Sequence, residues 1–219
     1  MDLKEIPWDD VAQATVDTLI MLGFSTVFTV AIGLPLGVLV FLCSRGQLLD
    51  NRVLYTALSS IINLFRSVPF VILMIALIPV TRMIVGTSIG VEGTIPPLVI
   101  GAAPFFARIV EQTLREIDRG VIEAAQAMGA STWHIVTRVL LPEARPGLIG
   151  GITITAITLV AYTAMSGMIG GGGLGDLAIR YGYQRFRLDI MAVTVVLLLL
   201  LVVLLQTVGD RLVARYNRK

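Results

Sequence analysis

Five long apolar stretches, each close to the length of a membrane-spanning helix, constrain this chain more than any other feature. The clearest covers residues 190–208, with VVLLLLLVVLL at its centre. A helix needs about 20 apolar residues to cross a hydrocarbon core of about 30 Å. Hydrophobic residues make up 56% of the 219 residues and charged residues only 15%, which is more apolar surface than a soluble domain of this length buries. The sequence predicts an all-α, multi-pass integral membrane protein with one domain over residues 1–219.

The other four predicted spans cover about residues 19–43, 54–80, 96–110 and 148–169. Pro35 lies inside the first of them, and Pro96 and Pro97 are expected in the first turn of the third, where proline is well tolerated. FRSVPF interrupts the second span and leaves two interpretations of Arg66 open. Either this arginine lines a cavity, or residues 54–66 form a surface helix and the span starts near Pro69.

The distribution of basic residues predicts the orientation, because loops rich in Lys and Arg stay in the cytoplasm. With five spans, one side of the membrane carries Arg45, Arg52, Arg108, Arg115, Arg119, Arg138, Arg145, Arg211, Arg215, Arg218 and Lys219. The other side carries Lys4, Arg82, Arg180, Arg185 and Arg187 together with Asp2, Glu5, Asp9, Asp10 and Asp17. We therefore expect the N-terminus outside and the C-terminus in the cytoplasm, together with the loop at residues 118–146.

This loop contains GVIEAAQAMGASTWHIVTRVLLPEARPG (residues 120–147), a mixed polar and apolar segment between two apolar stretches. Asp118 is the predicted N-cap of a first helix, in which Val121, Ala125 and Met128 share one face. Gly129 is expected to end or bend that helix.

Ser131 or Thr132 is expected to cap a second short helix in the same loop. Its apolar side is predicted to consist of Ile135, Val136, Val139 and Leu140. Pro142 is expected to stop it. The pattern is compatible with an amphipathic elbow that lies on the membrane without a partner. It is also compatible with a helix that docks in a groove of a cytosolic protein, where the small Ala124, Ala125 and Ala127 permit close approach.

The spacing of this loop resembles the EAA loop of ABC importer membrane subunits. Glu123-Ala124-Ala125 is followed after three residues by Gly129, and after nine more by Val139-x-Leu141-Pro142, where the family usually has Ile in place of Val139. In that family the loop is the coupling helix, seated in a cleft of the ATP-hydrolysing subunit. The resemblance implies that the coupling residues are Glu123, Ala124, Ala125, Met128, Gly129, Val139, Leu141 and Pro142.

The resemblance covers nearly the whole chain and is strongest to the methionine-import permeases of this family, through NLFRSVPF, IVGTSIG, GAAPFFAR, EAAQAMGA and GGGGLG. It implies a type I ABC importer fold and a homodimer in the inner membrane that imports D- and L-methionine. The implied partners are two ATPase subunits, which bind ATP and Mg²⁺, and an extracytoplasmic methionine-binding protein. No cofactor and no nucleic acid is expected on this chain. A permease for another amino acid is the alternative.

Polar residues inside the fourth span are candidates for the substrate path, because such residues are costly in lipid. Tyr162 and Met165 are three residues apart and Thr158 lies one turn before Tyr162, so the three share a face. An aromatic ring and a thioether suit a thioether substrate through sulfur–aromatic contacts. Ordinary packing between helices is the alternative for the same residues.

Other classes of protein fit less well. Gly170–Gly173 with Gly175 lacks the Lys-Ser/Thr of a phosphate-binding loop, so a tight turn or close packing where the binding protein docks is expected instead. Nearby Arg180, Tyr181, Tyr183, Arg185 and Arg187 either contact that partner or form a solvated loop. With one histidine, His134, and one cysteine, Cys43, neither a metal site nor an enzyme active site is expected. A secondary transporter would have more spans, an inverted repeat and acidic residues in the membrane core.

Overall fold

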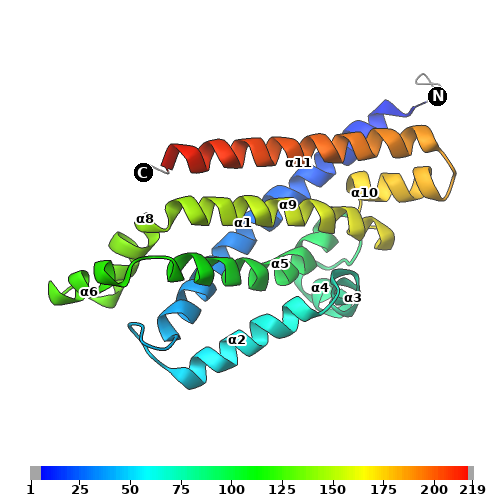
Figure 1. The fold of residues 1–219 in the computed structure, drawn as a ribbon. Helices are drawn as coiled ribbons and strands as arrows, with labels where there is room; N and C mark the ends of the chain where they lie inside the picture. Colours follow the sequence, from blue (N-terminus) through cyan, green and yellow to red (C-terminus); the bar gives the residue numbers. More distant parts are fainter. Residues whose placement is uncertain (1–5, 217–219) are drawn as a thin grey trace.

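The computed structural model describes residues 6–216, and these form helices without a β-strand (Figure 1). In chain order the elements are α1 (Trp8–Cys43), α2 (Arg52–Ser67), α3 (Phe70–Ala76), α4 (Ile78–Val85), α5 (Gly90–Arg115), α6 (Arg119–Ala127), α7 (Thr132–Ile135), the π-helical η2 (Val136–Leu140), α8 (Leu141–Glu143), α9 (Arg145–Ser166), the 3-10 turn η3 (Gly167–Ile169), α10 (Gly173–Leu177), the π-helical η4 (Ala178–Tyr183) and α11 (Leu188–Tyr216). Within the described residues α1, α5, α9 and α11 are long and apolar enough to cross a membrane, and α2 with α3 is a fifth candidate. The expected all-α architecture with about five spans is confirmed.

The first and third predicted spans were wrong at their N-terminal ends. α1 begins at Trp8 rather than near residue 19, and it carries Asp9 and Asp10 in its first turn, where carboxylates favour the helix dipole. α5 begins at Gly90, so Pro96 and Pro97 lie in its second turn rather than in its first. Hydropathy locates the part of a helix that lies in lipid, whereas the helix itself continues into polar sequence.

The second predicted span is not one helix. Val68 has an extended backbone with ψ 127°, and α2 and α3 on either side of it meet at 102°. Pro69 causes this break, because proline disfavours a helical conformation of the residue before it. α4 follows α3 and ends at Gly86, which has a left-handed backbone with φ 80°.

Four helices form the body of the molecule, and α5 is the innermost of them. α1 lies along α5 at very short range, since a Cβ atom on Gly37 would collide with the carbonyl oxygen of Ala107. α9 lies between α5 and α11 (Figure 1). In α5, 56% of the most apolar stretch is buried inside the chain, against 11% in α11. Most of α11 is therefore left for contact with lipid or with another subunit.

The glycine-rich turn after α9 holds the ends of three spans together. Gly170, Gly172 and Gly173 have φ between 74° and 80°, which only glycine adopts easily. The amide of Gly90 at the start of α5 donates to the carbonyl of Gly170 at 2.8 Å. The hydroxyl of Thr18 in α1 accepts from the amide of Leu174 at 2.8 Å. The tight turn expected at these glycines is confirmed.

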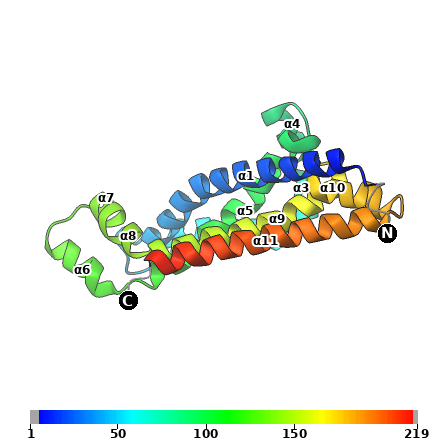
Figure 2. The ribbon, with the colours of Figure 1, turned by 90° about the horizontal axis from the view of Figure 1, so that it is seen from above.

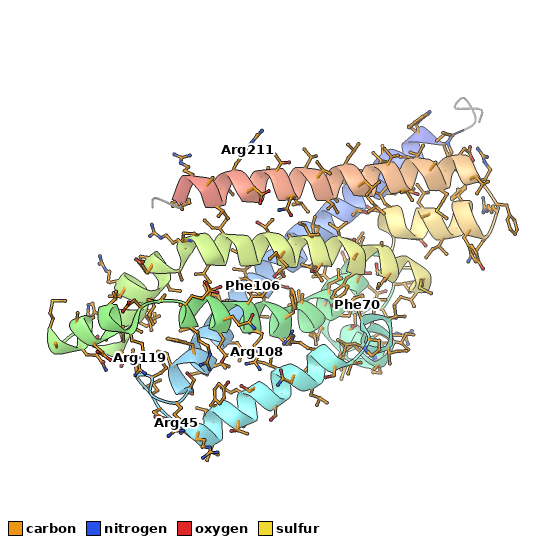
Figure 3. All side chains as sticks on the ribbon, in the orientation of Figure 1. Arg45, Phe70, Phe106, Arg108, Arg119 and Arg211 are labelled. Atoms are coloured by element: carbon orange, nitrogen blue, oxygen red, sulfur yellow. The ribbon has the colours of Figure 1, made fainter. Side chains whose placement is uncertain are left out.

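The described residues begin and end at opposite ends of the molecule (Figure 1). At the end where α11 finishes, α6 and α7 project beyond the spanning helices (Figure 2). We call residues 118–146 the elbow and this end of the molecule the elbow end. Arg45, Arg119 and Arg211 lie toward it, as Figure 3 shows. Of the charges used to predict the orientation, Asp2, Lys4, Glu5, Arg218 and Lys219 lie outside the described residues.

Candidate functional site

The first helix of the elbow has the ends that its sequence predicts. The carboxylate of Asp118 accepts a hydrogen bond from the amide of Gly120 at 2.6 Å, which caps α6. Gly129 follows α6 with φ 76° and turns the chain. Ser131, rather than Thr132, caps α7 by accepting from the amide of His134 at 3.4 Å, and its hydroxyl lies 2.8 Å from Nδ1 of the same histidine. Short-range hydrogen bonds thus cap both α6 and α7, and Gly129 makes the turn between them.

The face predicted for α6 is only partly correct. Ala125 is buried, as expected, but its partner in the protein core is Ile122. Val121 and Met128, placed on the same face by their spacing, are exposed, and Met128 retains 81% of its accessible surface. The prediction missed this because α6 contacts the rest of the chain through a narrow strip, so that most of its circumference points outward.

In the second part of the elbow, Ile135, Val136 and Leu140 are buried, and Val139 packs against the same core. The expected stop at Pro142 was wrong, because Pro142 lies inside α8. The π-helical η2 directly precedes this proline. Such a wider turn moves the preceding carbonyls away from the ring, which would otherwise clash with them.

The eight predicted coupling residues divide into two groups. Glu123, Ala124, Met128 and Gly129 are exposed on the elbow, whereas Ala125, Val139, Leu141 and Pro142 are buried or half-buried against the chain. Trp133, which the sequence did not single out, is 73% exposed. Two large apolar side chains, Met128 and Trp133, thus project from the elbow end of the molecule. Exposed apolar groups of this size are typical of a surface that contacts another protein.

The three predicted path residues differ in their surroundings. Tyr162 stacks on Phe70 of α3 with ring centroids 4.0 Å apart and planes 2° from parallel. Met165 is 41% exposed. The hydroxyl of Thr158 donates to the carbonyl of Ile154 in its own helix at 2.9 Å, so it is already satisfied. Of these three residues, Tyr162 borders a cavity.

That cavity has a volume of about 140 Å³ and lies where α2 breaks into α3. It is lined by Phe65, Arg66, Val68, Phe70, Leu73, Gly101, Phe105 and Tyr162. We call it the elbow-distal cavity, because Phe70, which borders it, lies away from the elbow end (Figure 3). Both interpretations left open for Arg66 are partly correct. Arg66 lines this cavity, but it is exposed and belongs to α2, a helix that ends before Pro69 and is separate from α3.

α5 carries a buried carboxylate that the sequence did not indicate, one residue beyond the predicted third span. Glu111 in α5 is 1% exposed and forms ion pairs with Arg108 and, at 2.7 Å, with Arg115. It also accepts from the hydroxyl of Tyr55 in α2 at 3.3 Å. A buried carboxylate is tolerated when it is paired and hydrogen-bonded. This network joins α2 to α5.

At the end opposite the elbow, most of the predicted docking residues are engaged within the chain. Arg180 pairs with Asp176 at 2.5 Å, and Arg185 lies over the ring of Tyr181 at 4.5 Å. The hydroxyl of Tyr181 donates to Asp10, and Arg187 pairs with Asp189. Tyr183 and Phe186 are left 72% and 85% exposed beside them.

Comparison of the sequence with known proteins places it among membrane transport components. The family model described as the binding-protein-dependent transport system inner membrane component matches residues 30–219. The chain is 50% identical over 211 residues to the probable D-methionine transport system permease protein MetI of Vibrio cholerae, covering 96% of this chain and 94% of that one. It is 48% identical over 210 residues to the methionine import system permease protein MetP of Bacillus subtilis, covering 96% and 92%.

Comparison with solved structures indicates the same kind of transport component. A chain from the inward-facing MetNI methionine ABC transporter is similar with a TM-score of 0.94 and 50% identity, covering 95% of this chain and 97% of that one. A chain of an amino acid ABC transporter, 21% identical with a TM-score of 0.70 over 92% of this chain, shares the fold. The resemblance carried by the EAA spacing is confirmed: the chain belongs to the family of inner membrane components of binding-protein-dependent transport systems.

Proposed function

We propose that residues 1–219 form one permease domain, the membrane-spanning subunit of an ATP-driven ABC importer for methionine. The observation that carries this proposal is the identity of about one half, over nearly the full length, to permeases named for methionine in two distant bacteria. The similarity to a chain of the MetNI methionine ABC transporter supports it.

The chain acts as a homodimer with two ATPase subunits and an extracytoplasmic methionine-binding protein. ATP and Mg²⁺ are bound and hydrolysed by the ATPase subunits, and this chain has a transport role only. The elbow is the coupling loop that docks on the ATPase subunit. Its exposed Glu123, Ala124, Met128 and Gly129 make the contact, with Trp133 beside them. The buried Ala125 and the half-buried Val139, Leu141 and Pro142 hold the elbow on the spanning helices.

The elbow end faces the cytoplasm and the N-terminus faces outside. The excess of arginine at the elbow end supports this orientation, since basic residues are retained on the cytoplasmic side. The end opposite the elbow, with exposed Tyr183 and Phe186, then faces the binding protein.

The substrate path runs past Tyr162, Met165 and Thr158 in α9. Tyr162 supports this assignment best, since it borders the elbow-distal cavity. ATP binding closes the ATPase subunits and draws the two elbows of the dimer together. The spanning helices are rigid and rock as a unit, which opens the path to the outside, and hydrolysis returns it to the inside. ATP and the loaded binding protein each favour one of the two states.

The test is uptake into proteoliposomes that contain the complete complex, with loaded binding protein outside and ATP on the elbow side. We expect accumulation of both L- and D-methionine that needs hydrolysable ATP and persists when ion gradients are collapsed. Uptake driven by an ion gradient without ATP would contradict the proposed class of transporter. ATP-dependent uptake of another amino acid in place of methionine would retain the class and contradict the substrate.

A further inference from the structure

Three arginines lie near the contact between α2 and α5, and they differ in their partners. Arg108 and Arg115 share the buried Glu111. Arg66, at the C-terminal turn of α2, lies with its guanidinium carbon 5.9 Å from the centre of the Phe105 ring. Among residues 6–216 no carboxylate lies within ion-pair distance of it.

Arg66 is exposed on the single chain, and it lies beside the bend of the candidate broken span that α2 and α3 form. It lies about 21 Å along the helix axis from Arg52, at the start of α2, given a rise of about 1.5 Å per residue. α2 runs from the elbow end toward the middle of the molecule, where α3 begins (Figure 1). An ionised side chain at membrane depth is expensive, and it usually faces a polar cavity and marks the path of a substrate. The ring of Phe105 compensates the charge only weakly.

The elbow-distal cavity beside Arg66 combines a positive charge with aromatic walls. Tyr162 and Phe70 form a flat, stacked surface on one side of it. Gly101 allows this, because a Cβ atom there would come within 3.2 Å of the Phe70 ring. A planar guanidinium binds a carboxylate through two parallel hydrogen bonds, and a thioether makes favourable contacts with aromatic rings.

We propose that Arg66 binds the α-carboxylate of the transported amino acid, while the Tyr162–Phe70 surface contacts its side chain. The substrate thus supplies the counter-charge that the described part of the chain lacks. This inference rests on the proposed function for the identity of the substrate. The charge requirement applies to any α-amino acid that passes through the cavity.

The experiment measures occupancy of the cavity itself. Val68 lines the cavity, and its replacement in Val68→Cys introduces a thiol there with little change in volume. The natural Cys43 is buried, at 1% exposure, and its slow reaction serves as background. In the complete complex in proteoliposomes, we follow the reaction of the new thiol with a small methanethiosulfonate reagent. The ligands are methionine and methioninamide, which keeps the side chain and the ammonium group but has no carboxylate.

We expect methionine to protect the thiol at a concentration about tenfold or more below that of methioninamide, because a hydrogen-bonded charge pair is lost with the amide. In Val68→Cys with Arg66→Gln this preference should disappear. Arg66→Lys should keep part of it, since lysine retains the charge but not the paired geometry. Arg52→Gln, at the other end of α2, is the matched control. In Val68→Cys with Arg52→Gln, the preference for methionine over methioninamide should be the same as in Val68→Cys alone.

Equal protection by the acid and the amide in the parent, or an unchanged preference in Arg66→Gln, would overturn the proposal. A lipid phosphate is the other anion within reach of an arginine in a membrane. If adding phosphatidylglycerol to phosphatidylcholine vesicles slows the reaction and methionine does not, Arg66 binds lipid and the inference is wrong. If the complex still takes up methionine in an ATP-dependent way, none of these results contradicts the proposed function. Protection by other amino acids but not by methionine contradicts the substrate and supports the role of Arg66.

Discussion

The elbow and the elbow-distal cavity are built in opposite ways. In the elbow, the caps and the turn are made by residues at most five positions apart, such as Asp118 with Gly120 and Ser131 with His134. In the cavity, Arg66, Phe105 and Tyr162 come from three different helices and meet only through packing. The elbow presents its large apolar side chains outward, whereas the cavity keeps its aromatic rings partly buried.

The difference indicates where each region is sensitive to substitution. A region made of local turns loses little when one cap is removed, but it fails when the backbone geometry of a turn is forbidden. A region made of side chains from several helices depends instead on the shape of each side chain that meets there.

The largest effect is expected from Gly129→Pro. Proline requires φ near −65°, whereas Gly129 has φ 76°, so the elbow cannot keep its corner. Methionine uptake by the complete complex should be abolished, while the separately purified ATPase subunit keeps its basal activity. Gly129→Asn is the matched control, because asparagine tolerates a left-handed backbone, and its uptake should stay near that of the parent. Undiminished uptake in Gly129→Pro would refute the docking role of the elbow.

Trp133→Ser should weaken binding of the ATPase subunit. Exposed aromatic anchors commonly contribute more than about 1 kcal/mol to an interface, so the affinity should fall by about fivefold or more. Binding of purified ATPase subunit to the permease in nanodiscs measures this directly. Phe186→Ser removes a comparably exposed ring at the opposite end and should leave the affinity unchanged. Equal affinities for the parent and Trp133→Ser would show that the exposed tryptophan is no anchor.

A smaller effect is expected at the cavity from Tyr162→Ala. It removes a stacked aromatic pair worth about 0.5–1.5 kcal/mol beyond the area that the rings bury, so uptake should fall by about two- to tenfold. Tyr162→Phe keeps the stacking and should retain most of the uptake. Both variants are compared by methionine uptake and by stimulation of ATP hydrolysis by the loaded binding protein. Parental values in Tyr162→Ala for both measurements would exclude this side chain from the path.

The smallest effect is expected from Asp118→Ala. Loss of an N-cap typically costs about 1 kcal/mol, and here the cost falls on α6 alone. Hydrogen exchange should become faster in residues 119–127 and stay unchanged in α9. Asp118→Asn retains a capping oxygen and should restore most of the protection. A loss of protection that extends through the spanning helices would mean that the elbow is not a local unit.

Much of the architecture could be predicted from the sequence, because it depends on local signals. Apolar runs indicated five spans. Residue type and spacing alone predicted the cap at Asp118, the turn at Gly129 and a second cap at Ser131 or Thr132, of which the structure has Ser131. The starts of α1 and α5 were missed because both helices continue into polar sequence, which hydropathy does not detect. Trp133 gave no sequence signal, since exposure of an aromatic residue is decided by what packs around it.

The sequence by itself thus determined the class of protein, the number of spans, the capped start and the turn of the elbow, and the family. Each follows from the periodicity, polarity or conformational limits of neighbouring residues. Only the tertiary structure decided that Arg66 faces a cavity, that Glu111 lies buried between two arginines, and that Tyr162 stacks on Phe70. These contacts join residues far apart in the chain. The break at Pro69 and the close packing of helices bring them together, and no local pattern records where a helix will meet its neighbour.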